Sequence, residues 1–264
     1  MSRADDLLRW YADVARPLPW RATRDPYALL VSEVMLQQTQ AARVVPRYEA
    51  FLARFPDVGA LASAPARDVL AAWNGLGYNR RALALRAAAR HVAAHGWPDD
   101  LTALPGVGAY TAAAVASFAW DAQRAAVDVN VARVIGRWDG RDYTPRPLAA
   151  RAAALLPPGR AAAWNQAMME LGATVCTART ARCAACPVAA GCASAGAPPA
   201  SRRSSRARPR FEETDRYARG RVVAALLAGE PLPAFPPERL ERALSGLADD
   251  GLVVRDAAGA PALP

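Results

Sequence analysis

The sequence predicts an all-α protein that ends in a small C-terminal module, and three observations lead to this fold class. Up to about residue 192 the chain reads as short helical segments interrupted by proline and glycine, with little strand-like alternation. Its 264 residues, 53% of them apolar, are enough for a sizeable core. Residues 195–210 are polar, basic and proline-containing, which is typical of a flexible linker. We therefore expect a helical domain over 1–194, a linker over 195–210 and a module over 211–264.

The individual helices follow from caps and periodicity. Asp25 followed by Pro26 is a typical N-cap with proline at the first helical position, and it predicts a helix through about Gln38. Periodic apolar segments predict further helices at 41–55, 66–74, 80–95, 110–120, 129–138, 147–155 and 161–171. Beyond the linker we expect helices at 214–228 and 237–249, then a hairpin formed by 252–254 and 260–263. That order of elements resembles a winged helix.

The charge of the chain indicates a polyanionic partner. Its formal net charge is +9 and its pI is about 10.1. All 33 basic residues are arginine, so no side chain can form a lysine Schiff base. The first residues lack the apolar core of a signal peptide, and no apolar stretch reaches the ~18 residues that a membrane span needs. We expect a cytoplasmic protein without a membrane partner.

Four cysteines, which are all that the chain contains, lie within a short stretch at Cys176, Cys183, Cys186 and Cys192. In a reducing compartment such a group predicts a metal site rather than disulfides. Zinc and an iron–sulfur cluster both suit four thiolates. The single C-x2-C pair with unequal longer gaps favours the cluster, although the spacing leaves zinc open.

The loop Pro105-Gly106-Val107-Gly108 lies between two predicted helices. Glycine allows the backbone to approach a ligand closely, and free amides at a helix start attract anions. Such a hairpin could grip a DNA phosphate without reading sequence. An ordinary tight turn between helices is the alternative interpretation.

Two carboxylates are candidates for chemistry. Glu33 is the only acid on an otherwise apolar helix, where its pKa is expected to rise. Asp128 precedes the helix predicted at 129–138, where it could be an N-cap or could direct a carboxylate into a cleft, kept charged by the helix-start amides. Two acids shifted in opposite directions suit cleavage of a glycosidic bond.

Together, five segments resemble the helix-hairpin-helix DNA glycosylases of the endonuclease III superfamily, and most closely the MutY-type adenine glycosylases. They are the cysteine run, Leu104-Pro-Gly-Val-Gly108, Val31-Ser-Glu-Val-Met-Leu-Gln-Gln-Thr39, Gly75-Leu-Gly-Tyr78 and Asn165-Gln-Ala-Met-Met-Glu-Leu-Gly172. The resemblance covers about residues 7–193. It implies two all-helical lobes with DNA between them, and a [4Fe–4S] cluster held by the four cysteines over residues 176–192.

The resemblance also implies roles for single residues. Glu33 matches the acid that protonates the flipped adenine, Asp128 the carboxylate that stabilises the sugar cation, and Tyr110 the position that is lysine in bifunctional relatives. The remaining matches are adenine-pocket residues (Trp20, Arg21, Leu36, Glu170), duplex-wedge and opposite-base residues (Gln38, Thr39, Leu76, Tyr78), the hairpin glycines (Gly106, Gly108) and the neighbour of the catalytic aspartate (Asn130). For Leu36 and Thr39, packing or capping is the preferred interpretation.

The implied activity is monofunctional excision of adenine opposite 8-oxoguanine or guanine in double-stranded DNA, by a monomer associated with the nucleoid. The chain departs from the family pattern after the linker. Family members usually continue into a larger Nudix-like domain that checks for 8-oxoguanine, whereas residues 211–264 follow a different pattern that resembles the short tail of actinobacterial adenine glycosylases. Preference for 8-oxoguanine over guanine is therefore less firmly predicted than adenine excision.

Three alternatives remain open from the sequence. A pyrimidine glycosylase and lyase would need the lysine that this chain lacks. A thymine glycosylase acting at G:T mismatches also carries tyrosine at the position of Tyr110, but such relatives tend to have an apolar residue where Glu33 stands. A non-catalytic iron–sulfur DNA-binding module would have no need of both Glu33 and Asp128.

Overall fold

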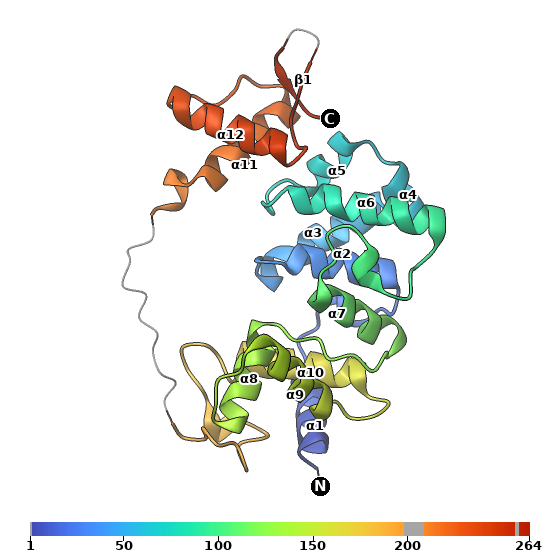
Figure 1. The fold of residues 1–264 in the computed structure, drawn as a ribbon, viewed down its shortest axis with the longest axis vertical. Coiled ribbons are helices and arrows are strands. Elements are labelled where there is room, and N and C mark those ends of the chain that lie inside the picture. Colours follow the sequence, from blue (N-terminus) through green and yellow to red (C-terminus); the bar gives the residue numbers. More distant parts are fainter. Residues whose placement is uncertain (1, 198–208, 257–258) are drawn as a thin grey trace. The chain divides into compact units, whose positions relative to one another are not determined.

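The computed structural model describes residues 2–197, 209–256 and 259–264. Within these residues the chain forms twelve α-helices and one two-stranded sheet, which confirms the predicted all-α class (Figure 1). Two compact units result. The first comprises the described residues of Met1–Leu30 and Val107–Arg203, and the second those of Val31–Gly106 and Ser204–Pro264. Among the described helices, none combines the length and apolar character that crossing a bilayer requires.

The first unit is built around α10. Its helices are α1 (Arg3–Val14), α7 (Ala109–Trp120), α8 (Val129–Asp139), α9 (Pro145–Leu155) and α10 (Ala161–Thr174), with 3-10 turns η1 (Pro19–Arg21) and η3 (Cys183–Ala185). Helix α10 packs against α1, α7 and α8. The core around it includes Leu7, Ile135, Met168 and the stacked rings of Trp138 and Trp164.

The second unit contains most of the remaining helices. They are α3 (Ala41–Arg54), α4 (Val58–Ser63), α5 (Ala66–Trp73), α6 (Arg80–His95), α11 (Asp215–Ala228) and α12 (Pro237–Asp249), with 3-10 turns η2 (Leu101–Ala103) and η4 (Phe211–Glu213). Helix α6 packs against α4 and α5, and α11 packs against α12 and α5. Phe51 and Trp73 meet edge to face with ring centroids 6.0 Å apart in its core.

Helix α2 (Pro26–Leu36) belongs to both units, since the boundary between them falls after Leu30. Its start is the predicted one, because Asp25 Oδ1 accepts a hydrogen bond from the Tyr27 N–H at 3.0 Å. Helices α8 and α11 end at glycines in the left-handed region, Gly140 with φ 67° and Gly229 with φ 69°. Glycine ends a helix in this conformation without steric strain because it has no Cβ.

The C-terminal residues contain the elements that the sequence predicts. Helices α11 and α12 are followed by strands β1 (Val254–Arg255) and β2 (Pro261–Ala262), which pair antiparallel with Val254 opposite Ala262. The strands are shorter than expected. The winged-helix class stays a prediction. Most of the predicted linker, residues 198–208, lies outside the described residues.

Two helices were not predicted. Helix α1 begins with a capping box. The Ser2 hydroxyl accepts a hydrogen bond from the Asp5 N–H, and the Asp5 carboxylate accepts one from the Ser2 N–H. Helix α4 has six residues and depends on Asp57, whose side chain accepts from the Ala60 N–H at 2.8 Å. Both start signals are present in the sequence, but each helix presents so few buried residues that the apolar pattern is weak.

Candidate active site and cysteine loop

Glu33 lies in the interior of the second unit. Only 4% of its surface is exposed, and its neighbours Ser32 and Val34 are buried as well. The carboxyl is therefore buried, and its pKa shift stays a prediction. Burial in low dielectric disfavours the ionised form of a carboxyl, so a glutamate in this position is suited to carry a proton.

Asp128 is the N-cap of α8 in the first unit. Its Oδ1 accepts hydrogen bonds from the backbone N–H groups of Asn130 at 2.9 Å and Val131 at 2.7 Å, and its Oδ2 accepts from Asn130 Nδ2 at 2.8 Å. The predicted cap is thus confirmed, and Asn130 is the direct partner of the aspartate. These bonds fix the carboxylate at the start of a helix whose positive end faces it.

Two residues that the sequence did not single out hold the surroundings of Asp128. Arg133 donates to Asn130 Oδ1 at 2.8 Å and to the carbonyls of Gly172 at 2.7 Å and Cys176 at 2.9 Å, and burial lowers the pKa of this guanidinium. Asn165, which is 3% exposed, accepts from the Ala126 N–H at 3.1 Å. The segment that leads to Asp128 is therefore tied to α10.

Tyr110 begins α7 in the first unit. It is half-buried, and its hydroxyl points to Met169 Sδ of α10 at 3.8 Å. The ring packs against a small cluster that contains Leu29 and Ala114. The Tyr110 hydroxyl therefore faces helix α10.

The two glycines of the 105–108 loop differ in what they require. Gly106 has φ 75°, and a Cβ there would lie 2.7 Å from the Cβ of Ala84, so only glycine fits. Gly108 is the N-cap of α7 with φ −87°, and a Cβ there would meet nothing within 4 Å. Pro105, Gly106 and Gly108 are exposed, so the backbone at this helix start is accessible to an anion.

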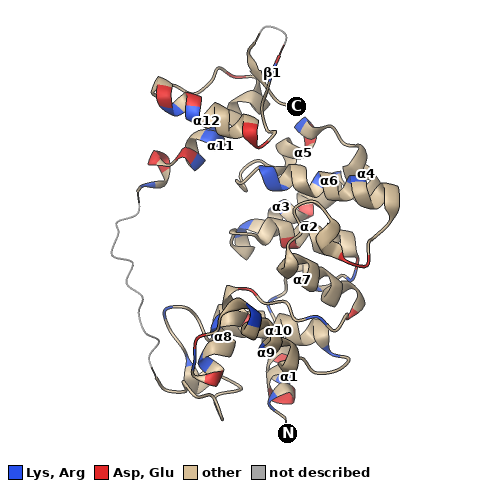
Figure 2. Ribbon diagram, in the orientation of Figure 1, with Lys and Arg blue, Asp and Glu red and all other residues tan. Residues whose placement is uncertain are grey.

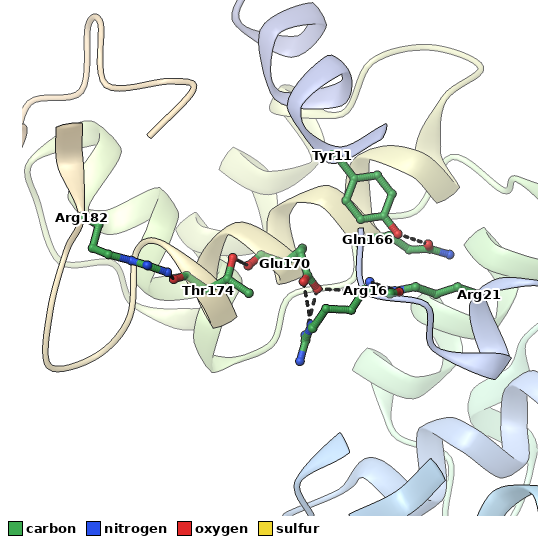
Figure 3. A network of polar contacts seen from close by, with 7 residues as sticks. All are labelled: Tyr11, Arg16, Arg21, Gln166, Glu170, Thr174 and Arg182. Carbon is green, nitrogen blue, oxygen red and sulfur yellow. Dashed lines mark hydrogen bonds and ion pairs between the residues drawn. The ribbon is translucent and has the colours of Figure 1, made fainter. Parts of the chain in front are cut away.

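Glu170 forms a buried ion cluster in the first unit (Figure 3). Its side chain is 0% exposed, and it accepts from Arg16 Nε at 2.6 Å and from Arg21 Nη2 at 2.6 Å. Although burial raises the pKa of Glu170, hydrogen bonds and charge from both arginines hold it below its usual value. Trp20, adjacent in sequence to Arg21, is also buried. The sequence predicted Arg21 and Glu170 but not Arg16.

The same network continues along α10 toward the cysteine loop (Figure 3). The Thr174 hydroxyl donates to the Glu170 carbonyl at 2.7 Å, and Arg182 of the cysteine loop donates to the Thr174 carbonyl. The guanidinium of Arg182 thus caps the C-terminal end of α10, where the helix dipole favours a positive charge.

Two exposed residues of the second unit adopt the left-handed backbone conformation. Gln38, in the turn after α2, has φ 57°, and Tyr78, in the loop before α6, has φ 49°. Tyr78 is 39% exposed, whereas Leu76 in the same loop is 2% exposed. Gln38 and Tyr78 can therefore meet a ligand directly, while the Leu76 side chain lies in the core.

Arg81 joins these two loops, and sequence reasoning missed it. Its guanidinium donates to the carbonyls of Val34 at 2.7 Å, Gln37 at 2.6 Å and Gly77 at 3.0 Å. It also lies 3.5 Å from the Thr39 hydroxyl. Burial, with help from the charge of Arg216, lowers the pKa of Arg81 to about 10. Leu36 is half-buried in the last turn of α2, which this arginine caps.

The four cysteines line one hollow in the first unit. Its other walls are mostly apolar, formed by Val175 and several alanines, with Arg137 as the main charged neighbour. Arg137 Nη1 lies 3.3 Å from the Cys176 sulfur. Burial raises the pKa of Cys186 and outweighs the lowering effect of a hydrogen bond with the backbone of Val188. In the described part of the chain, no three Cys, His, Asp or Glu side chains are grouped closely enough to hold a single metal ion.

Comparison with known proteins adds to this geometry. A model of the HhH-GPD superfamily base excision DNA repair proteins matches residues 31–158. The adenine DNA glycosylase of Mycobacterium tuberculosis (strain CDC 1551 / Oshkosh) is 44% identical, with the match covering 98% of this chain and 92% of that protein. The adenine DNA glycosylase of Homo sapiens is 40% identical over 81% of this chain and 41% of its own length.

Solved structures agree on the fold. A thermostable thymine-DNA glycosylase superposes with a TM-score of 0.65 at 31% identity, covering 69% of this chain and 90% of its own. Endonuclease III in a non-covalent DNA complex gives a TM-score of 0.62 at 22% identity, covering 73% of this chain and 95% of its own, which bears on the fold alone.

Proposed function

Because the chain belongs to the adenine DNA glycosylases of the helix-hairpin-helix base excision repair superfamily, we propose that it hydrolyses the N-glycosidic bond of adenine mispaired with 8-oxoguanine or guanine. Its substrate is double-stranded DNA, and it acts as a cytoplasmic monomer on the nucleoid. The observation that carries this proposal is Glu33, a carboxyl 4% exposed in an apolar helix. That setting supplies the acid that adenine departure requires.

The chemistry divides between two carboxylates. The flipped adenine accepts a proton from Glu33 on a ring nitrogen, so the glycosidic electron pair leaves with a neutral base. Positive charge develops on the sugar, and Asp128 stabilises it. Water then adds to the anomeric carbon and gives a proton to the Glu33 carboxylate, which leaves an abasic site and restores the acid. The hydrogen bonds from Asn130 and Val131 support this role because they hold the Asp128 carboxylate in place.

Strand cleavage by amine chemistry is not part of the proposal. The chain has no lysine side chain that could attack the sugar, and Tyr110 stands at the position that is lysine in bifunctional relatives. We assign Tyr110 to positioning the water and the base. Its contact with Met169 supports this role, since the ring is held on two sides by packing.

The adenine pocket is assigned to Trp20, Arg21, Leu36 and Glu170. Both carboxylate oxygens of Glu170 are paired with Arg16 and Arg21, so we assign Glu170 to orienting the two guanidinium groups. The oriented arginine and the buried indole of Trp20 then form the wall against which a purine packs.

Three loops are assigned to contacts with the DNA strands. Gly106 and Gly108 present backbone amides to a phosphate, which gives affinity without sequence readout. Gln38 and Tyr78 are exposed and reach the base opposite adenine, and Thr39 and Leu76 support them from beneath.

We assign the four cysteines to a [4Fe–4S] cluster, which would supply rigidity to the loop rather than chemistry. A hollow lined by four cysteines and several apolar side chains fits such a group, since soft thiolates suit iron–sulfur clusters. Arg179 and Arg182 lie within the run, between Cys176 and Cys183, and are candidate contacts to phosphate.

The substitution Glu33→Gln tests the assigned acid. It preserves shape but removes the acidic proton, so we expect adenine release to fall at least about 1000-fold while mismatch binding is retained. Strand cleavage by alkali after a single turnover measures adenine release, and a gel-shift assay measures binding to the mismatch. Unchanged turnover would remove Glu33 from this role.

A thymine glycosylase is the second candidate function, and the structural likeness to such an enzyme at 31% identity favours it. A panel of substrates distinguishes it from an adenine glycosylase. The panel compares A:8-oxoG, A:G, T:G and oxidised-pyrimidine duplexes. We expect adenine release from the first two only. Release of thymine alone would establish the alternative, and release from none would leave a binding module.

A further inference from the structure

The second unit contains a groove of about 980 Å³ between helix α11 and three loops of the helical domain. Its walls include Gln38, Tyr78 and Gly106 on one side and Arg216 and Arg221 on the other. Residues that lie far apart in the sequence therefore form one surface. The residues proposed above to contact DNA lie on its wall, together with side chains of α11 to which no role has been assigned.

The charge of this groove suits a polyanion. Six arginines line it, against two carboxylates: Arg43, Arg80, Arg81, Arg216, Arg219, Arg221, and Asp215, Asp250. Both carboxylates are already neutralised by arginine, Asp250 by Arg219 and by Arg80 at 3.6 Å, and Asp215 by Arg242 at 3.6 Å. Basic segments on α6 and α11 are visible in Figure 2. The surplus positive charge is thus available to phosphates.

Arg216 holds Tyr78 from across the groove. Its guanidinium carbon lies 3.9 Å from the centroid of the Tyr78 ring, and its Nη1 donates to the Tyr78 hydroxyl at 3.1 Å. Arg81 lies over the same ring at 5.6 Å. An exposed tyrosine beside two guanidinium groups combines an aromatic ring with positive charge, and this combination is typical of surfaces that bind nucleic-acid strands.

We propose that α11 completes the DNA-binding surface, with Arg216 as the positioning residue for Tyr78 and Arg221 as a phosphate contact. The ligand is the strand opposite the excised adenine. This choice of strand rests on the proposed function, which assigns Gln38 and Tyr78 to the opposite base. The C-terminal module therefore takes part in recognising the mispair, although it lacks the sequence pattern of the larger domain.

The test uses the full chain and fluorescently labelled A:8-oxoG and A:G duplexes. We expect Arg216→Ala to weaken binding to A:8-oxoG about tenfold, the usual effect of losing one stacking contact. Adding Tyr78→Ala to that variant should cost little more, because the two residues act together. Arg216→Lys, which retains a cation over the ring, should restore most of the affinity. A Tyr78 effect that is independent of Arg216 would contradict the positioning role.

Arg221→Gln provides a second measurement, because it leaves Tyr78 untouched. We expect the slope of log affinity against log salt to fall by about one, as for the loss of one phosphate contact. The matched control is Arg255→Gln in β1, which removes the same charge from the same module outside the groove. Equal salt slopes for the wild-type protein and both variants would contradict the proposal that the groove binds phosphate. Equal losses of slope for Arg221→Gln and Arg255→Gln would contradict it as well.

Failure of this proposal can be told apart from failure of the proposed function. If the wild-type protein releases adenine and the α11 variants bind both duplexes as it does, then only the groove assignment is wrong. If the wild-type protein releases no adenine from either duplex, the proposed function itself is wrong. Thermal unfolding of each variant confirms that the exposed substitutions leave the fold intact.

Discussion

At the scale of single residues, the two carboxylates proposed for catalysis are held by opposite means. Glu33 is buried in an otherwise apolar helix, whereas Asp128 is half-buried and accepts three hydrogen bonds at the start of α8. An apolar enclosure favours a neutral carboxylic acid, and hydrogen-bond donors complement a carboxylate charge. These two environments suit the proposed roles of proton donor for Glu33 and charge stabiliser for Asp128, and neither proposed role needs a metal.

Arg81 is the residue whose removal we expect to destabilise the second unit most. Its guanidinium satisfies carbonyls in both the turn after α2 and the loop before α6. Arg81→Met keeps the apolar stem but leaves these carbonyls without a donor, so we expect the free energy of unfolding to fall by about 3 kcal/mol. Urea unfolding followed by circular dichroism measures this loss.

Arg90→Met is the matched control on the same helix. Arg90 is exposed and donates to the Ala62 carbonyl at 3.1 Å. Its loss should cost less than about 1 kcal/mol. Similar losses for the two variants would show that Arg81 is an ordinary surface arginine.

At the scale of the element, the 105–108 loop contains two glycines with different requirements. Gly106→Ala places a Cβ 2.7 Å from that of Ala84 at φ 75°, so we expect destabilisation of about 2 kcal/mol. Gly108→Ala meets open space at φ −87° and should change stability by less than about 0.5 kcal/mol. Thermal and urea unfolding of both variants gives the comparison, and equal stability would contradict the predicted clash.

The extent to which elements could be predicted depends on how local their cause is. The helix over Arg80–His95 agrees with the expected bounds, and the N-cap Asp25 acts as expected, because both signals lie within a few residues. Helix α4, six residues long, was missed because one apolar turn is too short to establish a period.

Long-range partners could not be predicted from the sequence. Arg16 binds Glu170 across 154 residues of sequence, and Arg133 contacts the Cys176 carbonyl across 43. In a chain with 33 basic residues, nothing local distinguishes these arginines from solvated ones. The carboxylates were easier to identify, because an acid inside an apolar helix is unusual in itself.

At the scale of the whole molecule, the resemblance stated from the sequence is confirmed by relatives that match nearly the entire chain, at 44% identity in one case. The catalytic roles and the cluster stay predictions. Glu33 belongs to the second unit, and Asp128, Tyr110 and the four cysteines belong to the first. The cysteine loop therefore supports the unit that contains the sugar-stabilising carboxylate.

Cys186→Ser tests the whole-molecule role of the cluster. We expect bound iron to fall below about half of the wild-type content, because one of four thiolate ligands is lost. DNA affinity and thermal stability should fall with it, and turnover should decrease as a consequence of weaker binding. Iron analysis, gel shift and calorimetry measure these effects. Full activity in a protein without iron would show that the loop needs no cluster.

The backbone of Tyr78 stores conformational energy. A non-glycine residue at φ 49° lies on the order of 1 kcal/mol above an ordinary extended conformation, and contacts from Arg81 and Arg216 maintain it there. Any movement of the loop that returns this residue to negative φ releases that energy. In the wedge role proposed for Tyr78, such a movement would release this energy and offset part of the cost of separating the stacked bases.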